Sequence, residues 1–183
     1  MRYSKTHKEE TRRKLMDSSR ALVKQGGFDS TGVDALMAAI GLTSGAFYSH
    51  FPSKQALLEA VIAEEIDHSI DLLSVPPDAS AVEALRRLNL YLSAAHARHP
   101  EKGCVLPALG AELGRASPEV RGIVEKGLKQ LHKNLVNRFH SDEQAWAVMA
   151  QCVGALVLAR AVKTDKTRNE ILEANKHHIA RQG

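Results

Sequence analysis

The chain has 183 residues, of which 44% are hydrophobic and 25% are charged, so it is long enough to bury a sizeable core. This composition excludes a disordered or collagen-like chain. The polar opening segment and the two cysteines argue against secretion and a disulfide framework, so we expect a cytoplasmic protein. The longest nearly apolar stretch, 145–159, is shorter than the roughly 20 residues of a membrane span, so we expect a buried helix and no membrane partner.

Positive charge is concentrated in the amino-terminal third. Residues 1–54 contain nine Lys or Arg and five Asp or Glu, a net charge of +4, whereas the remaining 129 residues contain sixteen of each. This asymmetry predicts a polyanionic partner for the amino-terminal end. A solvated basic surface without a partner is the alternative.

Helical periodicity runs through almost the whole chain, and no stretch has a strand pattern, so the predicted fold class is all-α. Caps and stops predict the first four helices over 8–25, 33–40, 43–50 and 54–74. The pair Gly26-Gly27 ends the first of these and Gly41 ends the second. The residues that stand where amino-terminal caps belong are Ser30 or Thr31, Thr43 or Ser44, and Ser53.

Longer amphipathic helices are predicted beyond Pro76-Pro77, over 81–98, 104–115, 118–140, 143–162 and 166–181. Their expected caps are Asp78 or Ser80, Ser117, Ser141 or Asp142, and Thr164 or Asp165. The sequence therefore predicts a small basic helical unit joined to a larger neutral bundle through the long fourth helix.

The second and third predicted helices, separated by a glycine-containing turn, have the proportions of a helix-turn-helix. The third presents small and hydrogen-bonding side chains, and only Phe47 and Phe51, spaced i and i+4, fit a core. Small residues permit close approach to a groove floor, and hydroxyls with free amides suit phosphate oxygens. An ordinary short connecting helix is the alternative.

The run 31–58, TGVDALMAAIGLTSGAFYSHFPSKQALL, closely resembles the DNA-binding domain of the tetracycline-repressor (TetR) family. The matching residues are Ala39, Gly41, the pair Ser44-Gly45, the aromatic run Tyr48-Ser-His-Phe51, and Lys54. The resemblance extends over about residues 8–62. It implies a helix-turn-helix DNA-binding domain over 1–53, followed by a helical ligand-binding and dimerisation domain over 54–183.

The resemblance also assigns two sets of positions to DNA. The positions that match phosphate contacts are Thr31, Thr43, Tyr48, His50 and Lys54, and each of these side chains can donate to a phosphate oxygen. The positions that match base-facing residues are Ser44, Gly45, Ala46 and Ser49. None of these four is Arg, Asn or Gln, so we expect modest direct readout, supplemented by DNA shape and by Arg2 or Lys5 in the leading arm.

The predicted function is a ligand-responsive transcriptional regulator that binds a palindromic operator as a homodimer. Repression is the favoured mode of regulation, and no enzymatic activity is predicted. One helix-turn-helix makes too few contacts for specific binding, so a symmetric pair is expected. The last two predicted helices would form the dimer bundle, where Gly154, Ala155 and Ala159 leave room for close approach. The alternatives are a helical binding protein with an incidental basic end and a thiol-dependent enzyme.

Four residues are candidates for the pocket of an unidentified small-molecule effector, although core packing explains the same spacing: Tyr91, Cys104, Trp146 and Met149. Cys104 stands at an expected helix start after Lys102, where the helix dipole and the cation would lower the pKa of the thiol. The alternative function is therefore a regulator that senses oxidants or electrophiles through Cys104. A packing role is the favoured interpretation of this cysteine.

No metal or cofactor is predicted. His96, His99 and Cys104 lie close in sequence, but a structural zinc site usually has four ligands and no clear fourth is in range. Cys152 lies within the apolar stretch and is expected to be a core residue.

Overall fold

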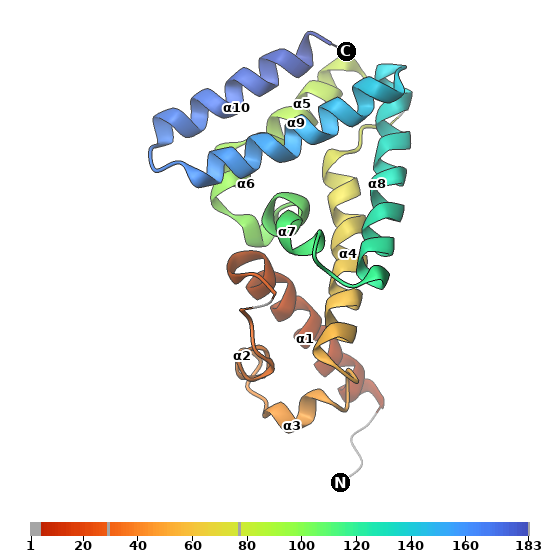
Figure 1. Ribbon diagram of the computed structural model, residues 1–183, viewed down its shortest axis with the longest axis vertical. Helices are drawn as coiled ribbons and strands as arrows, with labels where there is room; N and C mark the ends of the chain where they lie inside the picture. Colours follow the sequence, from red (N-terminus) through yellow and green to blue (C-terminus); the bar gives the residue numbers. More distant parts are fainter. Residues whose placement is uncertain (1–4, 29, 77, 183) are drawn as a thin grey trace.

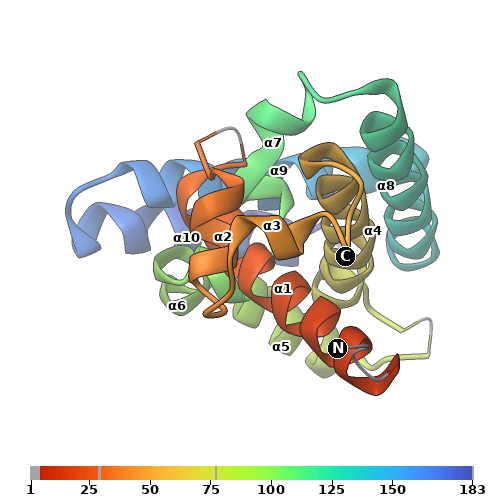
Figure 2. The same cartoon turned by 90° about the horizontal axis from the view of Figure 1, so that it is seen from below.

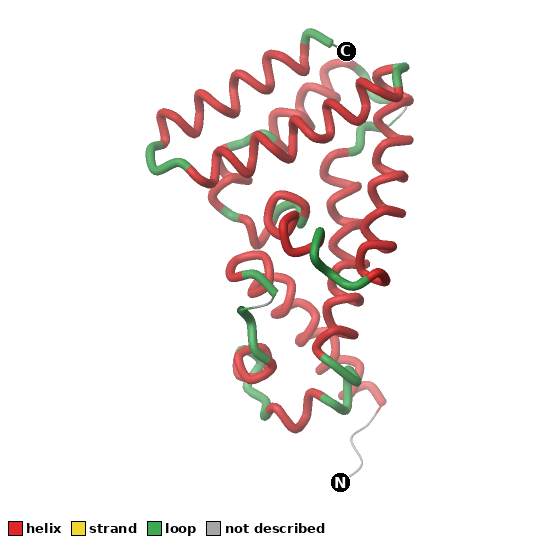
Figure 3. The backbone as a smooth tube through the Cα atoms, in the orientation of Figure 1, coloured by secondary structure: helices red, strands yellow, loops and turns green. Residues whose placement is uncertain are grey.

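The computed structural model describes residues 5–28, 30–76 and 78–182, and the regular structure in these ranges is helical, with no strand (Figures 1 and 3). The predicted all-α class is confirmed. The helices are α1 (Lys5–Gly26), α2 (Val33–Ala38), α3 (Ser44–Phe47), α4 (Lys54–Leu73), α5 (Ala81–Tyr91), α6 (Ala94–Arg98), the 3₁₀ helix η1 (Pro100–Lys102), α7 (Leu106–Leu113), α8 (Pro118–Phe139), α9 (Asp142–Ala161) and α10 (Asp165–Ala180).

The described residues form two hydrophobic cores. The smaller core lies between α1, α2, α3 and the first turns of α4, and it buries Leu15, Leu36 and Phe47 completely. The larger core extends along α4 and α8, which run side by side, to α9 and α10, which lie across one end of this pair (Figure 1). Each core removes apolar side chains from water, which is the main favourable contribution to folding.

Helix α4 belongs to both cores. Leu57 and Val61 lie in the smaller core, whereas Leu58, Ile62 and Ile66 lie in the larger one. A 20-residue helix spans about 30 Å, so α4 runs from the small unit deep into the large bundle. Because α4 is shared in this way, the domain boundary after residue 53 stays a prediction.

Hydroxyl caps account for the starts of most helices. The capping side chains that accept a hydrogen bond from the backbone amide three residues later are Ser53, Ser80, Ser93, Ser117, Ser141 and Thr164. The predicted cap of α2, Ser30 or Thr31, is wrong, because Gly32 occupies the cap position and makes no side-chain bond. The hydroxyls of Ser30 and Thr31 donate instead to the carbonyls of Gly26 and Gly27, which close the end of α1.

The predicted helix over 81–98 is interrupted in the structure. Helix α5 ends at Tyr91, and Ser93 caps α6 by accepting from the His96 amide at 3.1 Å. The His96 ring then binds the Tyr91 carbonyl oxygen through Nδ1 at 2.7 Å. A serine that can cap a new helix competes with helix continuation, and helical periodicity alone does not reveal this competition.

A buried ion pair joins the small unit to the large bundle. Lys24 Nζ of α1 lies 2.8 Å from Glu65 Oε2 of α4, and it also donates to the Gly103 carbonyl oxygen at 3.1 Å. Lys24 is 6% exposed and Glu65 is 4% exposed. Arg20 Nε lies 3.7 Å from the other Glu65 oxygen. Three separate segments of the chain therefore meet at the buried Lys24 ammonium.

Candidate nucleic-acid interface

A glycine turn sets the angle between α2 and α3. The amide of Gly41 donates to Ala38 O at 3.0 Å and the amide of Leu42 donates to Met37 O at 2.9 Å, which is the Schellman pattern of a helix end. Gly41 has φ +71°, in the left-handed region that favours glycine. The glycine therefore allows the chain to turn directly from α2 into α3.

The first residues of α3 are held by α2. Ser44 Oγ donates to Asp34 Oδ1 across the turn. Thr43 occupies the cap position without a side-chain cap bond, and its side chain is exposed. Ser44, which the sequence assigns to base edges, is thus engaged within the motif, while Thr43 faces solvent.

The outer face of α3 and the turn after it are open to solvent on the side of the molecule seen in Figure 2. Phe47 is fully buried, whereas the next residue, Tyr48, is 65% exposed and packs edge-on against the Phe47 ring with centroids 5.3 Å apart. Gly45 and Ser49 are also exposed. This arrangement anchors the helix through one aromatic ring and presents a phenol hydroxyl outward from the other.

Two of the residues predicted to contact DNA, Thr31 and Ala46, are not exposed. Thr31 is buried, and its hydroxyl already donates to Gly27 O at 2.6 Å, so that proton is not free for a phosphate oxygen. Ala46 is half-buried and packs against the smaller core. The structure therefore exposes Thr43, Gly45, Tyr48 and Ser49 at α3, whereas Thr31 is buried in the connection between α1 and α2 and Ala46 is half-buried.

Cations of α1 flank the far end of this surface, and the sequence pattern had not assigned them to DNA. Arg12 Nη1 donates to the His50 carbonyl oxygen at 2.8 Å, and the Arg12 guanidinium lies 4.0 Å from the centroid of the Phe51 ring. Lys8 is exposed one turn earlier on α1. The i, i+4 spacing of Lys8 and Arg12 was a usable signal, although only the fold places it beside α3.

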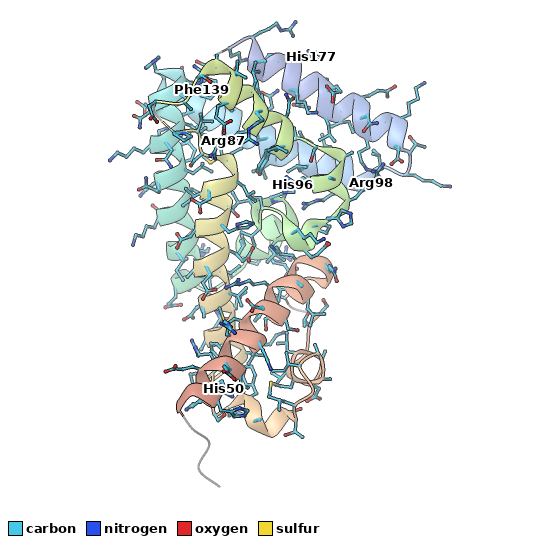
Figure 4. All side chains as sticks on the ribbon, turned by 180° about the vertical axis from the view of Figure 1, so that it is seen from behind. His50, Arg87, His96, Arg98, Phe139 and His177 are labelled. Carbon is cyan, nitrogen blue, oxygen red and sulfur yellow. The ribbon has the colours of Figure 1, made fainter. Side chains whose placement is uncertain are left out.

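His50 lies among these cations, at the end of the molecule remote from Arg87 and Phe139 (Figure 4). Burial lowers the pKa of its imidazole, and the nearby charges of Lys8 and Arg12 lower it further. Its Nδ1 atom is buried without a hydrogen-bond partner. A neutral imidazole is favoured here, and an approaching phosphate would favour the charged form.

Lys54 marks the other side of the surface, at the first position of α4. Its Nζ lies 4.4 Å from the centroid of the Phe28 ring, which fixes the ammonium near the amino end of the helix. The positive end of the helix dipole adds to the charge at this place. An exposed helix with hydroxyl groups is thus bordered by cations from α1 and α4, an arrangement suited to a phosphate backbone.

The predicted effector residues are not brought together in one cavity. Trp146 is 43% exposed and stacks on the His132 ring, with centroids 4.2 Å apart. Tyr91 and Met149 are buried in the larger core. Tyr91 also lines an open hollow beside α5 and α6, which Met149 does not border.

The prediction of a low pKa for the Cys104 thiol is wrong. Cys104 is fully buried two residues before α7 begins, and burial raises its pKa because the thiolate loses water. Hydrogen bonds with Ser69 and Tyr91 offset this shift only in part. Burial likewise raises the pKa of Cys152 to about 12. Both buried thiols are therefore expected to act as packing residues.

Within the described ranges, no three His, Cys, Asp or Glu side chains are arranged to hold a metal ion. His96 is engaged at both ring nitrogens, since Nδ1 binds Tyr91 O and Nε2 accepts from the Cys104 amide at 3.0 Å. This engagement fixes the segment before α7 against α6.

Comparison with known proteins is consistent with this geometry. Residues 15–61 match the family described as "Bacterial regulatory proteins, tetR family". The chain is 26% identical over 129 residues to the HTH-type transcriptional repressor DhaR of Mycobacterium sp. (strain GP1), an alignment that covers 68% of this chain and 65% of the relative. It is 26% identical over 97 residues to the HTH-type transcriptional repressor KstR of Rhodococcus jostii (strain RHA1), which covers 53% and 46% respectively. The chain thus spans less than two thirds of each relative.

A solved structure extends the likeness of the fold to almost the whole chain. A TetR-family transcriptional regulator from Agrobacterium tumefaciens superposes with a TM-score of 0.78 at 20% identity, over 94% of this chain and 98% of that chain. At this identity the likeness concerns the fold. The helix-turn-helix and the family match over residues 15–61 make the amino-terminal part of the chain similar to the DNA-binding part of the tetR family of bacterial regulatory proteins, and the relatives named above are HTH-type transcriptional repressors.

Proposed function

We propose that the chain is a cytoplasmic transcriptional repressor that binds a palindromic operator as a homodimer and releases it when a small molecule binds. The observation that carries this proposal is the exposed surface of α3 between cations of α1 and α4. Groups of this kind hold a duplex by its phosphates, while side chains on the helix reach base edges.

The residues divide by role. The proposed phosphate contacts are Thr31, Thr43, Tyr48, His50 and Lys54, to which the structure allows Lys8 and Arg12 to be added. The proposed base-facing residues are Ser44, Gly45, Ala46 and Ser49. The Thr31 hydroxyl would have to give up its hydrogen bond to Gly27 O to reach a phosphate oxygen, so we expect it to make the weakest phosphate contact of the set.

The proposed dimer surface is the outer face of α9. Apolar residues on this face recur at steps of three and four, which is the pattern of a helix seam that meets another helix: Ala147, Ala150, Gly154, Val157 and Ala161. Val157 is 47% exposed and Leu158 is 58% exposed. Ala155 and Ala159, in contrast, are buried in the chain's own core, so they do not belong to this face.

Among the described helices, α9 is the one whose length and composition would allow it to cross a membrane, with 39% of its most apolar window buried. A second copy of α9 would cover its remaining apolar face. Gly154 has open space at its Cβ position, which allows close approach of a partner helix.

Lys54→Ala is expected to weaken binding to all duplexes and to lower the salt dependence, because it removes one phosphate contact. The slope of log K against log salt should fall by about one unit for Lys54→Ala and stay unchanged for Tyr48→Phe, which removes a hydroxyl without charge. Fluorescence anisotropy with a random-sequence duplex between about 50 and 200 mM salt measures both.

Lys126→Ala, on the exposed face of α8, is the matched control, because that lysine lies outside the proposed interface. An unchanged slope for Lys54→Ala, or an equal fall for Lys126→Ala, contradicts the assignment. A helical binding protein with an incidental basic end would bind duplexes only weakly and would show no preference for a palindromic sequence.

A further inference from the structure

An apolar cavity that is partly open to solvent lies at the end of the bundle that is remote from α3. It has a volume of about 150 Å³ and is bounded by the end of α4, α5, the end of α8, α9 and α10. Its wall includes the apolar side chains Leu73, Leu88, Leu135, Phe139, Val148 and Ile179. An apolar cavity of about 150 Å³ is large enough to hold a benzene molecule.

Two arginines, Arg87 and Arg138, are the charged residues of this wall. Arg87 is held in place, since Nε donates to Glu83 Oε1 at 3.0 Å and Nη1 donates to the carbonyls of Asp71 and Ser74. Arg138 makes no ion pair with any described residue. Glu83 also binds Arg86, but neither of these residues lines the cavity, so among the described residues its wall contains two guanidinium groups and no carboxylate.

We propose that this cavity binds a small monocarboxylic acid with an apolar body of about six carbons, and that such an acid is the effector. The hydrocarbon part would fill the space between the leucines, and the carboxylate would bind the Arg138 guanidinium, with Arg87 beside it. Guanidinium groups bind carboxylates in a fork geometry that an alcohol or an amine cannot reproduce. A mostly apolar pocket with a few convergent polar groups is the usual form of a small-molecule site.

The position of the cavity also supplies a route to the DNA-binding surface, and this part rests on the proposed function. Arg87 holds the last carbonyls of α4, and Leu72 and Leu73 of α4 line the cavity. The same helix begins at Lys54 at the other end of the molecule, where Figure 4 shows His50. A carboxylate that binds Arg87 would compete with its hydrogen bonds to the carbonyl oxygens of Asp71 and Ser74, and so would change the position of the end of α4. A ligand that binds one position of α4 more tightly shifts the population of molecules toward that position.

Calorimetric titration of the full chain with benzoate and hexanoate tests the site directly. Ligands of this size reach Kd values of about 1 mM, so titration to about 10 mM is sufficient. We expect at least one acid to bind, and benzyl alcohol or hexanol to bind about tenfold more weakly, because they lack the charge. Comparing the two acids distinguishes an aromatic from an aliphatic body. Failure of both acids to bind, or equal binding of acids and alcohols, overturns the proposal.

Substitutions assign the charge. Arg138→Met should lower acid affinity about tenfold without changing alcohol affinity, whereas Arg138→Lys should retain part of the acid affinity. Arg121→Met is the matched control, because Arg121 is exposed on the same helix and does not line the cavity. Equal acid affinity for wild type and Arg138→Met overturns the carboxylate assignment.

Duplex binding in the presence of the acid separates this proposal from the proposed function. We expect the acid to lower operator affinity in wild type and to have no effect in Arg138→Met. Acid binding with unchanged operator affinity overturns the effector role, although the site itself would stand. If the chain bound no DNA at all, the proposed function would fail, and calorimetry would still decide whether the site exists.

Discussion

Replacing Val157 and Leu158 together by glutamate is expected to convert the dimer to monomers and to weaken operator binding by about 100-fold or more. The two side chains lie on the exposed apolar face of α9, so charges there should oppose pairing without entering the chain's own core. Two linked reading heads gain affinity because the second half-site is engaged at a high effective concentration, a gain of about 10²- to 10⁴-fold. Light scattering after gel filtration and anisotropy with the operator duplex measure the two effects.

The matched control is the double substitution Val82→Glu and Leu90→Glu on α5. These side chains are 77% and 58% exposed, comparable to those on α9, but they lie outside the proposed dimer face. The control should stay dimeric and keep its operator affinity. A dimeric Val157→Glu, Leu158→Glu variant would show that another surface joins the two copies, and a monomer with full affinity would show that pairing is not needed.

Lys24→Met is expected to cost about 3–5 kcal/mol of the free energy of unfolding. The substitution leaves Glu65, which is 4% exposed, as a buried carboxylate without its closest cation, and it also removes the donor to Gly103 O. Breaking one partner of a buried pair has an effect of this size, whereas replacing both partners by apolar residues is often neutral. The double substitution Lys24→Met and Glu65→Leu should therefore recover most of the loss.

Urea unfolding at fixed protein concentration measures this effect, because the stability of a dimer depends on concentration. Lys14→Met, on the exposed face of the same helix, is the control and should change stability by less than about 0.5 kcal/mol. A loss below about 1 kcal/mol for Lys24→Met, or no recovery in the double variant, would mean that the pair is not what fastens α1 to α4.

The parts of the fold that local chemistry determines were predictable from the sequence. Serine and threonine caps fixed the starts of α4, α5, α8, α9 and α10, because a cap bond spans only three residues. Gly41 in the turn and the buried Phe47 and Phe51 of the motif follow from similarly short patterns. The helix-turn-helix was therefore the most predictable part of the molecule.

Features that depend on distant segments could not be predicted. The bond from Arg12 to His50 joins residues 38 apart in sequence, and the Lys24–Glu65 pair joins residues 41 apart. The pKa of Cys104 was expected to fall because of its sequence neighbours, but burial by other helices raises it. The cavity with Arg87 and Arg138 likewise requires five helices to meet, and the periodicity of each helix says only which residues face inward.

Operator recognition by a homodimer can be tested by selecting bound duplexes from a random pool and then determining the mass of the complex. We expect enrichment of an inverted repeat whose half-sites lie about 34 Å apart, or a multiple of this spacing, with an even number of chains on each duplex. Enrichment of no sequence, or of a single half-site occupied by one chain, would contradict it.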